Sequence, residues 1–335
     1  MKFYKLLFFI TMIIGTLISI SAYSWLGMWI GLEINMISII PLFSNYKNMY
    51  STEAAMKYFL TQTLASMFIL MTIILLSTNS FIFYNLNQTL IMIMNSALFT
   101  KMGAAPFHFW FPEVIEGLSW FNSLILLTWQ KIAPMILIMY NIKFNSFIMM
   151  VIICSMIVSS IMGFNQISLR KILAFSSINH IGWMISALIN SKIIWLIYFI
   201  IYSIISINII YIFNKFKMFY LNQLIMISNY NPITKIFFML NFLSLGGIPP
   251  FLGFFPKWMV IYNLNLNNQY FLSFIMIMFT LLTFYFYLRI MFSTLLINHN
   301  SPLKLNNFKN KFYMMIFNFI ALSSLILFPM IFNFY

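Results

Sequence analysis

The sequence predicts an all-α polytopic membrane protein with about eleven transmembrane helices: two inverted five-helix repeats with broken helices 4 and 9, and one further helix. Three observations support this fold class. Hydrophobic residues make up 63% of the 335 residues and charged residues only 7%, whereas soluble domains carry roughly a quarter charged residues. Turn-type residues divide the chain into apolar segments close to the roughly 20 residues that a bilayer-spanning helix needs. Two of these segments contain glycine and proline clusters, and they lie five helices apart.

The segments follow one another with short connections. They cover residues 4–22, 25–43, 54–77, 88–112, 119–140, 146–163, 169–189, 193–213, 232–264, 269–297 and 312–333. We expect a first five-helix repeat over 1–140, a second, inverted repeat over 141–297, and a loop with the C-terminal transmembrane helix over 298–335. The first segment follows a basic start like that of a signal peptide. Its apolar part is long and no clean small-residue cleavage site follows, so we interpret it as a membrane helix.

The ninth segment is too long for one straight helix. It would measure roughly 50 Å at 1.5 Å per residue, against about 30 Å of hydrocarbon. It must therefore bend or break, and GGIPP is the place, because adjacent prolines remove backbone donors and glycine tolerates the resulting backbone. The fourth segment contains a milder version, GAAP. The residues that define the two breaks are Gly103, Pro106, Gly246, Gly247, Pro249 and Pro250.

The spacing of the two breaks points to a repeat. Because five is odd, helices 1 to 5 and 6 to 10 would run in opposite directions, which is the topology of an inverted repeat. Interrupted helices at matching positions of two inverted halves are typical of a transport pathway. Two unrelated proline kinks are the alternative interpretation.

The basic residues indicate the orientation of the chain. There are 18 Lys and Arg against 4 acidic residues, and the basic residues stand singly or in pairs at segment ends, as membrane topology places them. We therefore expect no nucleic-acid partner. If the segments alternate, only Lys143 and Lys192 fall opposite the amino-terminal side, which predicts an amino terminus on the cytoplasmic or matrix side. The amino-terminal side receives Lys2, Lys5, Lys47, Arg170, Lys171, Lys215, Lys217, Lys304, Lys309 and Lys311.

Four ionisable residues fall near the centres of their predicted helices: Glu33, Lys101, Lys131 and Lys257. Each costs roughly 2.5 to 3.5 kcal/mol on insertion scales. One glutamate cannot neutralise three lysines, and desolvation disfavours the ammonium form. A lysine that can lose its proton inside a membrane is a plausible relay for protons. The alternative is a buried Glu–Lys pair that fixes helix registry, with the other lysines snorkelling to an interface.

The remaining ionisable residues have simpler interpretations. Glu53 and Lys57 are four apart at a helix start, as an i,i+4 ion pair would be. Two further glutamates follow the fourth helix, and we expect them to be solvated loop acids: Glu113 and Glu116.

His180 lies roughly 15 Å into the seventh helix. It can exchange protons near neutral pH, or it can be a core histidine satisfied by a neighbouring hydroxyl, and both interpretations stay open. The chain has no Gly-rich phosphate loop, no Cys cluster beside the lone Cys154, and no paired histidines for haem. We therefore expect no redox chemistry in this chain.

Seven motifs resemble one family. They are GLEIN, STEAAMKYFLTQ, KMGAAPFHFWFPEV, LLTWQKIAP, LRKILAFSSINHIGWM, LSLGGIPPFLGFFPKW and YFYLR, in this order. Together they resemble the chain 2 family of antiporter-like membrane subunits of mitochondrial NADH:ubiquinone oxidoreductase, respiratory complex I. The resemblance implies that Glu33 pairs with Lys101 beside a broken helix and that Lys131 and Lys257 continue a hydrated proton-transfer axis. His180 also matches a family histidine, with a secondary role.

The resemblance implies a proton-translocating subunit of a H+-translocating NADH:ubiquinone reductase, located in the mitochondrial inner membrane. It implies lipids and other membrane-arm subunits as partners, including antiporter-like sister subunits. NADH, FMN, iron-sulfur clusters and ubiquinone are expected in other subunits, and no cofactor or metal in this chain. A start without an imported-precursor pattern and a composition without Asp indicate translation inside the organelle. The alternatives are a stand-alone cation/proton antiporter and a mainly structural membrane-arm subunit.

Overall fold

A computed structural model describes residues 3–45, 48–78, 87–142, 145–224, 232–249 and 251–295. The chain divides into two compact units, Met1–Ser155 and Met156–Tyr335. In the described residues every regular element is a helix, apart from an isolated bridge between Ser168 and Tyr220. Eight helical spans in the described residues are long and apolar enough to cross a membrane, and one of them, Trp120–Tyr140, contains two consecutive helices. The prediction of an all-α polytopic membrane protein is therefore confirmed.

Some sequence predictions fall outside the described residues. The predicted eleventh helix, 312–333, and the whole predicted region 298–335 are among them, and so is Pro250 of the second break. The same holds for six of the lysines that bear on orientation: Lys2, Lys47, Lys143, Lys304, Lys309 and Lys311. The predicted repeat boundaries at 140 and 297 stay a prediction.

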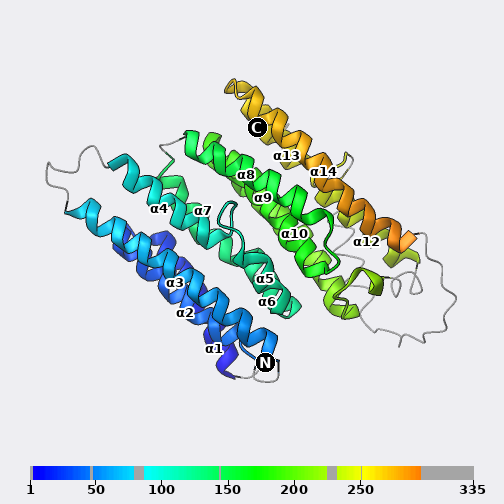
Figure 1. Cartoon of the computed structure of the whole chain (residues 1–335), viewed down its shortest axis with the longest axis horizontal. Helices are drawn as coiled ribbons and strands as arrows, with labels where there is room; N and C mark the ends of the chain where they lie inside the picture. Colours follow the sequence, from blue (N-terminus) through cyan, green and yellow to red (C-terminus); the bar gives the residue numbers. More distant parts are fainter. Residues whose placement is uncertain are drawn as a thin grey trace, which may run out of the picture. The chain divides into compact units, whose positions relative to one another are not determined.

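The first unit contains seven helices in its described part (Figure 1). They are α1 (Phe3–Ser21), α2 (Trp25–Phe43), α3 (Met49–Ser77), α4 (Asn87–Met102), α5 (Trp110–Gly117), α6 (Trp120–Leu127) and α7 (Trp129–Tyr140), and α8 (Asn145–Phe164) continues into the second unit. Helix α3 begins five residues before the predicted start at 54. Its first turn, MYSTE, is too polar to stand out in an apolar run, which explains the difference.

Helices α1 and α2 approach each other closely at two glycines. A Cβ atom on Gly31 would lie 2.7 Å from the Cα atom of Ser19, and one on Gly15 would lie 2.8 Å from the Asn35 nitrogen. Side chains larger than hydrogen would therefore separate the two backbones. Small residues at such contacts are common between membrane helices, because they allow close packing. This contact fixes α2, which carries Glu33.

The fourth predicted segment is broken in the structure. Helix α4 ends at Met102, α5 begins at Trp110, and the backbone between them is not helical. Gly103 has a φ of +74°, which favours glycine, and the Ala105–Pro106 peptide is cis. The indole of Trp110 donates to the Thr100 carbonyl oxygen at 3.0 Å and so joins the two helices across the gap. The interruption is more complete than the mild kink that GAAP suggested.

The fifth predicted segment contains an interruption that the sequence reading missed. Helix α6 ends at Leu127 and α7 begins at Trp129, with Thr128 at φ −114° and ψ −70° between them. The Thr128 hydroxyl donates to the Leu124 carbonyl oxygen at 2.8 Å, a side-chain bond that often bends helices. Pro134 has no N–H to offer the Gln130 carbonyl. Lys131 therefore lies in a first helical turn rather than in the middle of one continuous helix.

The second unit is built around a buried helix. Its described elements are α9 (Leu169–Asn190), α10 (Lys192–Phe216), the short 3₁₀ helix η2 (Leu221–Leu224), α12 (Pro232–Gly246), α13 (Phe254–Leu266) and α14 (Tyr270–Leu295). In an apolar stretch of 18 residues of α9, 94% of the residues are buried. Figure 1 shows α10 running alongside α9, and α13 and α14 also contact α9. A helix that is covered on all sides is a place for polar side chains that must avoid lipid.

The ninth predicted segment is also broken, which confirms the prediction of a second interrupted helix. Helix α12 ends at Gly246 and α13 begins at Phe254. Gly247 has a φ of +77°, and Pro249 lies in the turn that follows. A Cβ atom on Gly253 would lie 2.7 Å from the carbonyl carbon of Ser244. The start of α13 therefore crosses directly against the end of α12.

Candidate functional site

The buried Lys101 and the half-buried Glu33 form a pair in the first unit. The Glu33 Oε1 atom lies 4.0 Å from the Lys101 Nζ atom, and the side chains are 19% and 4% exposed. Lys101 is in the last turn of α4, where the negative end of the helix dipole favours a cation. The separation is longer than the roughly 2.7 to 2.9 Å of a charge-assisted hydrogen bond. The pair is therefore held by Coulombic attraction and leaves room for the two groups to move.

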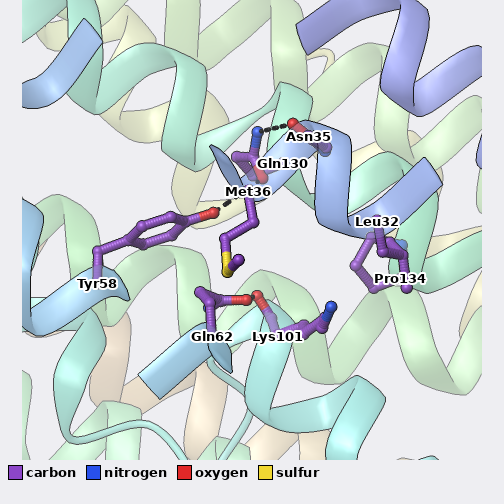
Figure 2. Close-up of a pocket in the computed structure, with 8 residues that line it drawn as sticks. All are labelled: Leu32, Asn35, Met36, Tyr58, Gln62, Lys101, Gln130 and Pro134. Atoms are coloured by element: carbon purple, nitrogen blue, oxygen red, sulfur yellow. Dashed lines mark hydrogen bonds between the residues drawn. The ribbon is translucent and has the colours of Figure 1, made fainter. Parts of the chain in front are cut away.

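A small cavity lies beside Lys101 (Figure 2). Its walls come from α2, α3, α4 and α7, and it has room for about one water molecule. The lining residues are Leu32, Asn35, Met36, Tyr58, Gln62, Lys101, Gln130 and Pro134. Five of these eight residues are polar or charged, so a water molecule there would find hydrogen-bond partners.

A chain of neutral polar groups crosses the same cavity. The Tyr58 hydroxyl donates to Gln130 Oε1 at 3.2 Å, and Gln130 Nε2 donates to Asn35 Oδ1 at 2.8 Å, as Figure 2 shows. Gln62 Nε2 donates to the backbone oxygen of Lys101 at 3.5 Å, one of the carbonyls that the end of α4 leaves without a helical partner. The chain thus connects α3, α7 and α2 around the lysine.

Sequence reasoning missed these groups. Asn35, Gln62 and Gln130 each stand inside an apolar segment, and that position was the available signal. Uncharged polar side chains in membrane helices mark interhelical hydrogen bonds about as often as functional sites, so the signal is weak beside that of a charge.

Lys131 is the most buried of the lysines in the described residues, with 1% of it exposed. Its Nζ atom lies 5.7 Å from the centre of the Phe111 ring, a cation–π distance. Phe111 belongs to α5, and its side chain fills the space where a Cβ atom on Gly103 would lie, at 3.0 Å. Lys131 therefore contacts the broken fourth segment beyond the break, whereas Lys101 precedes it. Burial of this kind is incompatible with snorkelling.

Lys257 lies at the second break and is 7% exposed. Its Nζ atom donates to the backbone oxygens of Gly246 at 2.8 Å and Leu245 at 3.3 Å. It also lies 5.8 Å from the centre of the Trp183 ring on α9. The amine is thus held by the end of α12 and by an aromatic face.

His180 is buried in the second unit, with 5% of it exposed. Its Nδ1 atom is 2.8 Å from the Tyr198 hydroxyl, and its ring centre lies 4.9 Å from that of Tyr202. The hydroxyl partner expected of a core histidine is therefore present. His180 also lines a cavity with residues of the second break: the lining is His180, Tyr198, Ile201, Tyr202, Ile205, Ser244, Leu245, Gly253 and Pro256. Both interpretations from the sequence thus have a structural counterpart.

A separate charged cluster lies at the surface of the first unit. Lys57 is 2.9 Å from both Glu53 and Glu113, and the three side chains are 43% to 60% exposed. The expected i,i+4 pair is present. Glu113 is exposed, as predicted, but the prediction of a loop position was wrong for both Glu113 and Glu116, because both lie in α5, and Glu113 also pairs with α3. Exposed ion pairs contribute little to stability because solvent screens them, and the Lys57–Glu113 pair joins α3 to α5.

Each unit thus contains an interrupted helix with a buried lysine beside it. The structure brings Glu33 and Lys101 together and places Lys131 against the same interrupted segment, and in the second unit it places Lys257 and His180 at the second break. Among the described residues, no group of three or more His, Cys, Asp or Glu side chains is arranged to hold a metal ion. Buried amines beside freed backbone groups and water-sized space can donate and accept protons.

Comparisons with known proteins place the chain in a family. Residues 22–283 match the family model described as NADH:quinone oxidoreductase/Mrp antiporter, TM. A relative from Anopheles gambiae, named NADH-ubiquinone oxidoreductase chain 2, is 51% identical over 335 residues, which covers 97% of each chain.

Two solved structures share the fold. A chain of respiratory complex I from Thermus thermophilus has a TM-score of 0.87 at 21% identity, covering 97% of this chain and 78% of that one. A chain of the Mrp complex from Dietzia sp. has a TM-score of 0.73 at 15% identity, covering 87% of this chain and 60% of that one. At these identities the likeness is one of fold.

Proposed function

The chain belongs to the NADH-ubiquinone oxidoreductase chain 2 family, and on this premise we propose that it is a proton-translocating, antiporter-like core subunit of the membrane arm of respiratory complex I. NADH oxidation and ubiquinone reduction take place elsewhere in the complex, and the chain couples them to proton transfer. The observation that carries this proposal is the buried pair of Glu33 and Lys101, 4.0 Å apart beside an interrupted helix.

The pair provides a controllable charge. Two unit charges at this separation attract by roughly 4 kcal/mol at an effective dielectric constant of 20. A conformational change that moves Glu33 away weakens this attraction, and Lys101 then releases its proton more easily. The cavity beside Lys101 offers room for a water molecule, and the break frees backbone groups that can orient it.

Lys131 is the next station in this mechanism. It receives a proton from Lys101, or returns one, through ordered water, and Lys257 in the second unit exchanges protons onward. His180 has a secondary role at the second break. The burial of all three lysines supports this assignment, because a buried ammonium without use is costly in a membrane.

The same proposal covers the surroundings of the chain. Its partners are other membrane-arm subunits, including antiporter-like sister subunits, and lipids. NADH, FMN, iron-sulfur clusters and ubiquinone bind to other subunits. The chain is translated inside the organelle and lies in the mitochondrial inner membrane, with the amino terminus on the matrix side. The uneven distribution of lysines along the sequence supports this orientation.

Replacing Lys101 by Met tests the proposal. The substitution would be made in the assembled complex of a genetically tractable relative, at the equivalent position. We expect proton translocation in proteoliposomes to fall by roughly tenfold or more, since losing about 1.4 kcal/mol of interaction changes a rate or equilibrium by that factor. Lys192→Met is the matched control, because Lys192 is exposed at the start of α10. Wild-type proton translocation in an assembled Lys101→Met complex would refute the assignment and favour a structural subunit.

A stand-alone cation/proton antiporter is the second candidate, favoured by the shared fold with the Mrp complex chain. The two candidates differ in their dependence on partners. Reconstituted alone in liposomes, a stand-alone antiporter exchanges cations for protons down an imposed gradient. A complex I subunit shows no such exchange alone and moves protons only within the complex.

A further inference from the structure

Lys257 lies in a part of the chain without acidic side chains. The four acidic residues are all glutamates, and the last of them is Glu116. Residues 117–335 therefore contain neither Asp nor Glu but 13 of the 18 basic residues: Lys131, Lys143, Arg170, Lys171, Lys192, Lys215, Lys217, Lys235, Lys257, Arg289, Lys304, Lys309 and Lys311. The carboxylate that accompanies Lys101 has no counterpart in the second unit, so the Lys257 ammonium needs another source of negative charge.

The end of α12 supplies that charge. The last carbonyls of a helix have no partner within it. Here the Gly247 N–H bonds the oxygens of Leu243 and Ser244, and the next two oxygens, of Leu245 and Gly246, accept from Lys257 Nζ. The lysine thus completes the cap of α12. In return, it lies at the negative end of the helix dipole, which is equivalent to about half an elementary charge.

The backbone around the amine is shaped to hold it. A Cβ atom on Gly247 would lie 2.9 Å from Lys257 Nζ and 2.7 Å from its Cδ atom, so only glycine leaves this space open. Gly253 brings the start of α13, and with it Lys257, against the end of α12. The Trp183 ring, 5.8 Å from Nζ, closes the site from α9. Two carbonyl oxygens and an aromatic face are a usual set of partners for an alkylammonium ion.

We infer that the interrupted end of α12 is a cation-binding site, formed by the carbonyl oxygens of Leu245 and Gly246 and the Trp183 ring, with Lys257 as its tethered cation. A primary alkylammonium ion binds there when the lysine is absent. The site gives Lys257 its counter-charge, and its importance for proton transfer rests on the proposed function. Its ability to bind a cation does not.

Thermal stability tests the site without reference to proton transfer. Lys257→Ala removes the four terminal heavy atoms of the side chain, which propylammonium replaces. We expect propylammonium chloride to raise the temperature at which the Lys257→Ala complex loses this subunit, on the order of a degree or more and saturating with concentration. Wild type should show no such shift, because its own ammonium occupies the site.

Two controls isolate the binding. Lys257→Met keeps a side chain of similar length that fills the space, so propylammonium should not stabilise it. Tetramethylammonium chloride has the charge but no N–H group, so it should not stabilise Lys257→Ala. An equal shift in wild type or Lys257→Met, or no shift in Lys257→Ala, would overturn the inference. If Lys257→Ala does not assemble, propylammonium present during assembly should restore the complex, and failure to restore it overturns the inference equally.

Proton translocation by the same variant separates the two proposals. A Lys257→Ala complex that binds propylammonium and translocates protons at the wild-type level would remove Lys257 from the proton path and leave the cation site supported. A Lys257→Ala complex that loses proton translocation and shows no propylammonium effect would support Lys257 in the proton path and refute the cation site.

Discussion

Each of the three buried lysines in the described membrane helices lies beside a helix interruption, and each has a different stabilising neighbour. Lys101 has the Glu33 carboxylate at 4.0 Å. Lys131 has the Phe111 ring, and Lys257 has the carbonyl end of α12. A carboxylate can be moved by its own helix, whereas a helix end moves only with the break. Each amine is therefore stabilised by a different structural element.

Replacing Glu33 by Gln tests the carboxylate directly. The amide is similar in size but carries no charge, so the attraction of roughly 4 kcal/mol at an effective dielectric constant of 20 is lost. We expect proton translocation coupled to NADH oxidation to fall by roughly tenfold or more, measured in proteoliposomes containing the assembled complex.

Glu53→Gln is the matched control for this experiment. Glu53 is 60% exposed and pairs with Lys57 at the surface, where solvent screens ion pairs and they contribute little to stability. It should translocate protons like the wild type. Equal losses in the two variants would show that total charge, and not the buried pair, determines coupling.

At the residue scale, the sequence identifies the charged side chains of the site better than the groups that contact them. Glu33 and the three lysines stand out because a charge in an apolar segment is costly. The partners of Lys257 could not be predicted, because backbone oxygens leave no trace in a sequence. The chain of Tyr58, Gln130 and Asn35 was missed for a related reason: its hydrogen bonds depend on how three helices pack, which no local pattern encodes.

At the scale of elements, the sequence predicted the ends of helices closely where an apolar run ends. It predicted the interruptions inside helices less completely. The breaks at GAAP and GGIPP were predicted, because both contain prolines and glycines. The interruption at Thr128 was missed, because a lone threonine followed by a proline six residues later is tolerated in continuous membrane helices. It matters for function, since it puts Lys131 in a first turn.

The contact of α1 with α2 gives a prediction for this scale. Gly31→Ala places a methyl group 2.7 Å from the Ser19 Cα atom, so the backbones must separate. We expect less assembled complex and a lower midpoint of thermal dissociation. At Gly27 the nearest atoms are side-chain atoms of Ala22 and Ser24 at 3.1 and 3.2 Å.

Gly27→Ala is therefore the matched control, and it should be neutral or stabilising, because alanine favours a helix over glycine by roughly 1 kcal/mol. Equal losses of assembled complex in the Gly31→Ala and Gly27→Ala variants would mean that assembly does not depend on the close approach of α1 and α2.

For the whole molecule, composition alone predicted a polytopic membrane protein, and the glycine and proline clusters predicted where two of its helices are interrupted. The distribution of charge is uneven: every acidic side chain lies in residues 33–116. A lysine of the first unit therefore has a carboxylate beside it, whereas Lys257 in the second unit has backbone oxygens instead. The sequence shows this asymmetry as a count, but only the fold shows that α12 ends at the lysine.

The central claim is that buried lysines carry protons through this chain. Its most direct test measures how many protons an assembled Lys131→Met complex translocates for each NADH that it oxidises. Lys131 is 1% exposed and lies at an interruption, and Met preserves its length without the amine. The account predicts a lower proton yield than in wild type and in Lys192→Met, with the subunit still present in the purified complex. An unchanged proton yield in that assembled complex would contradict it.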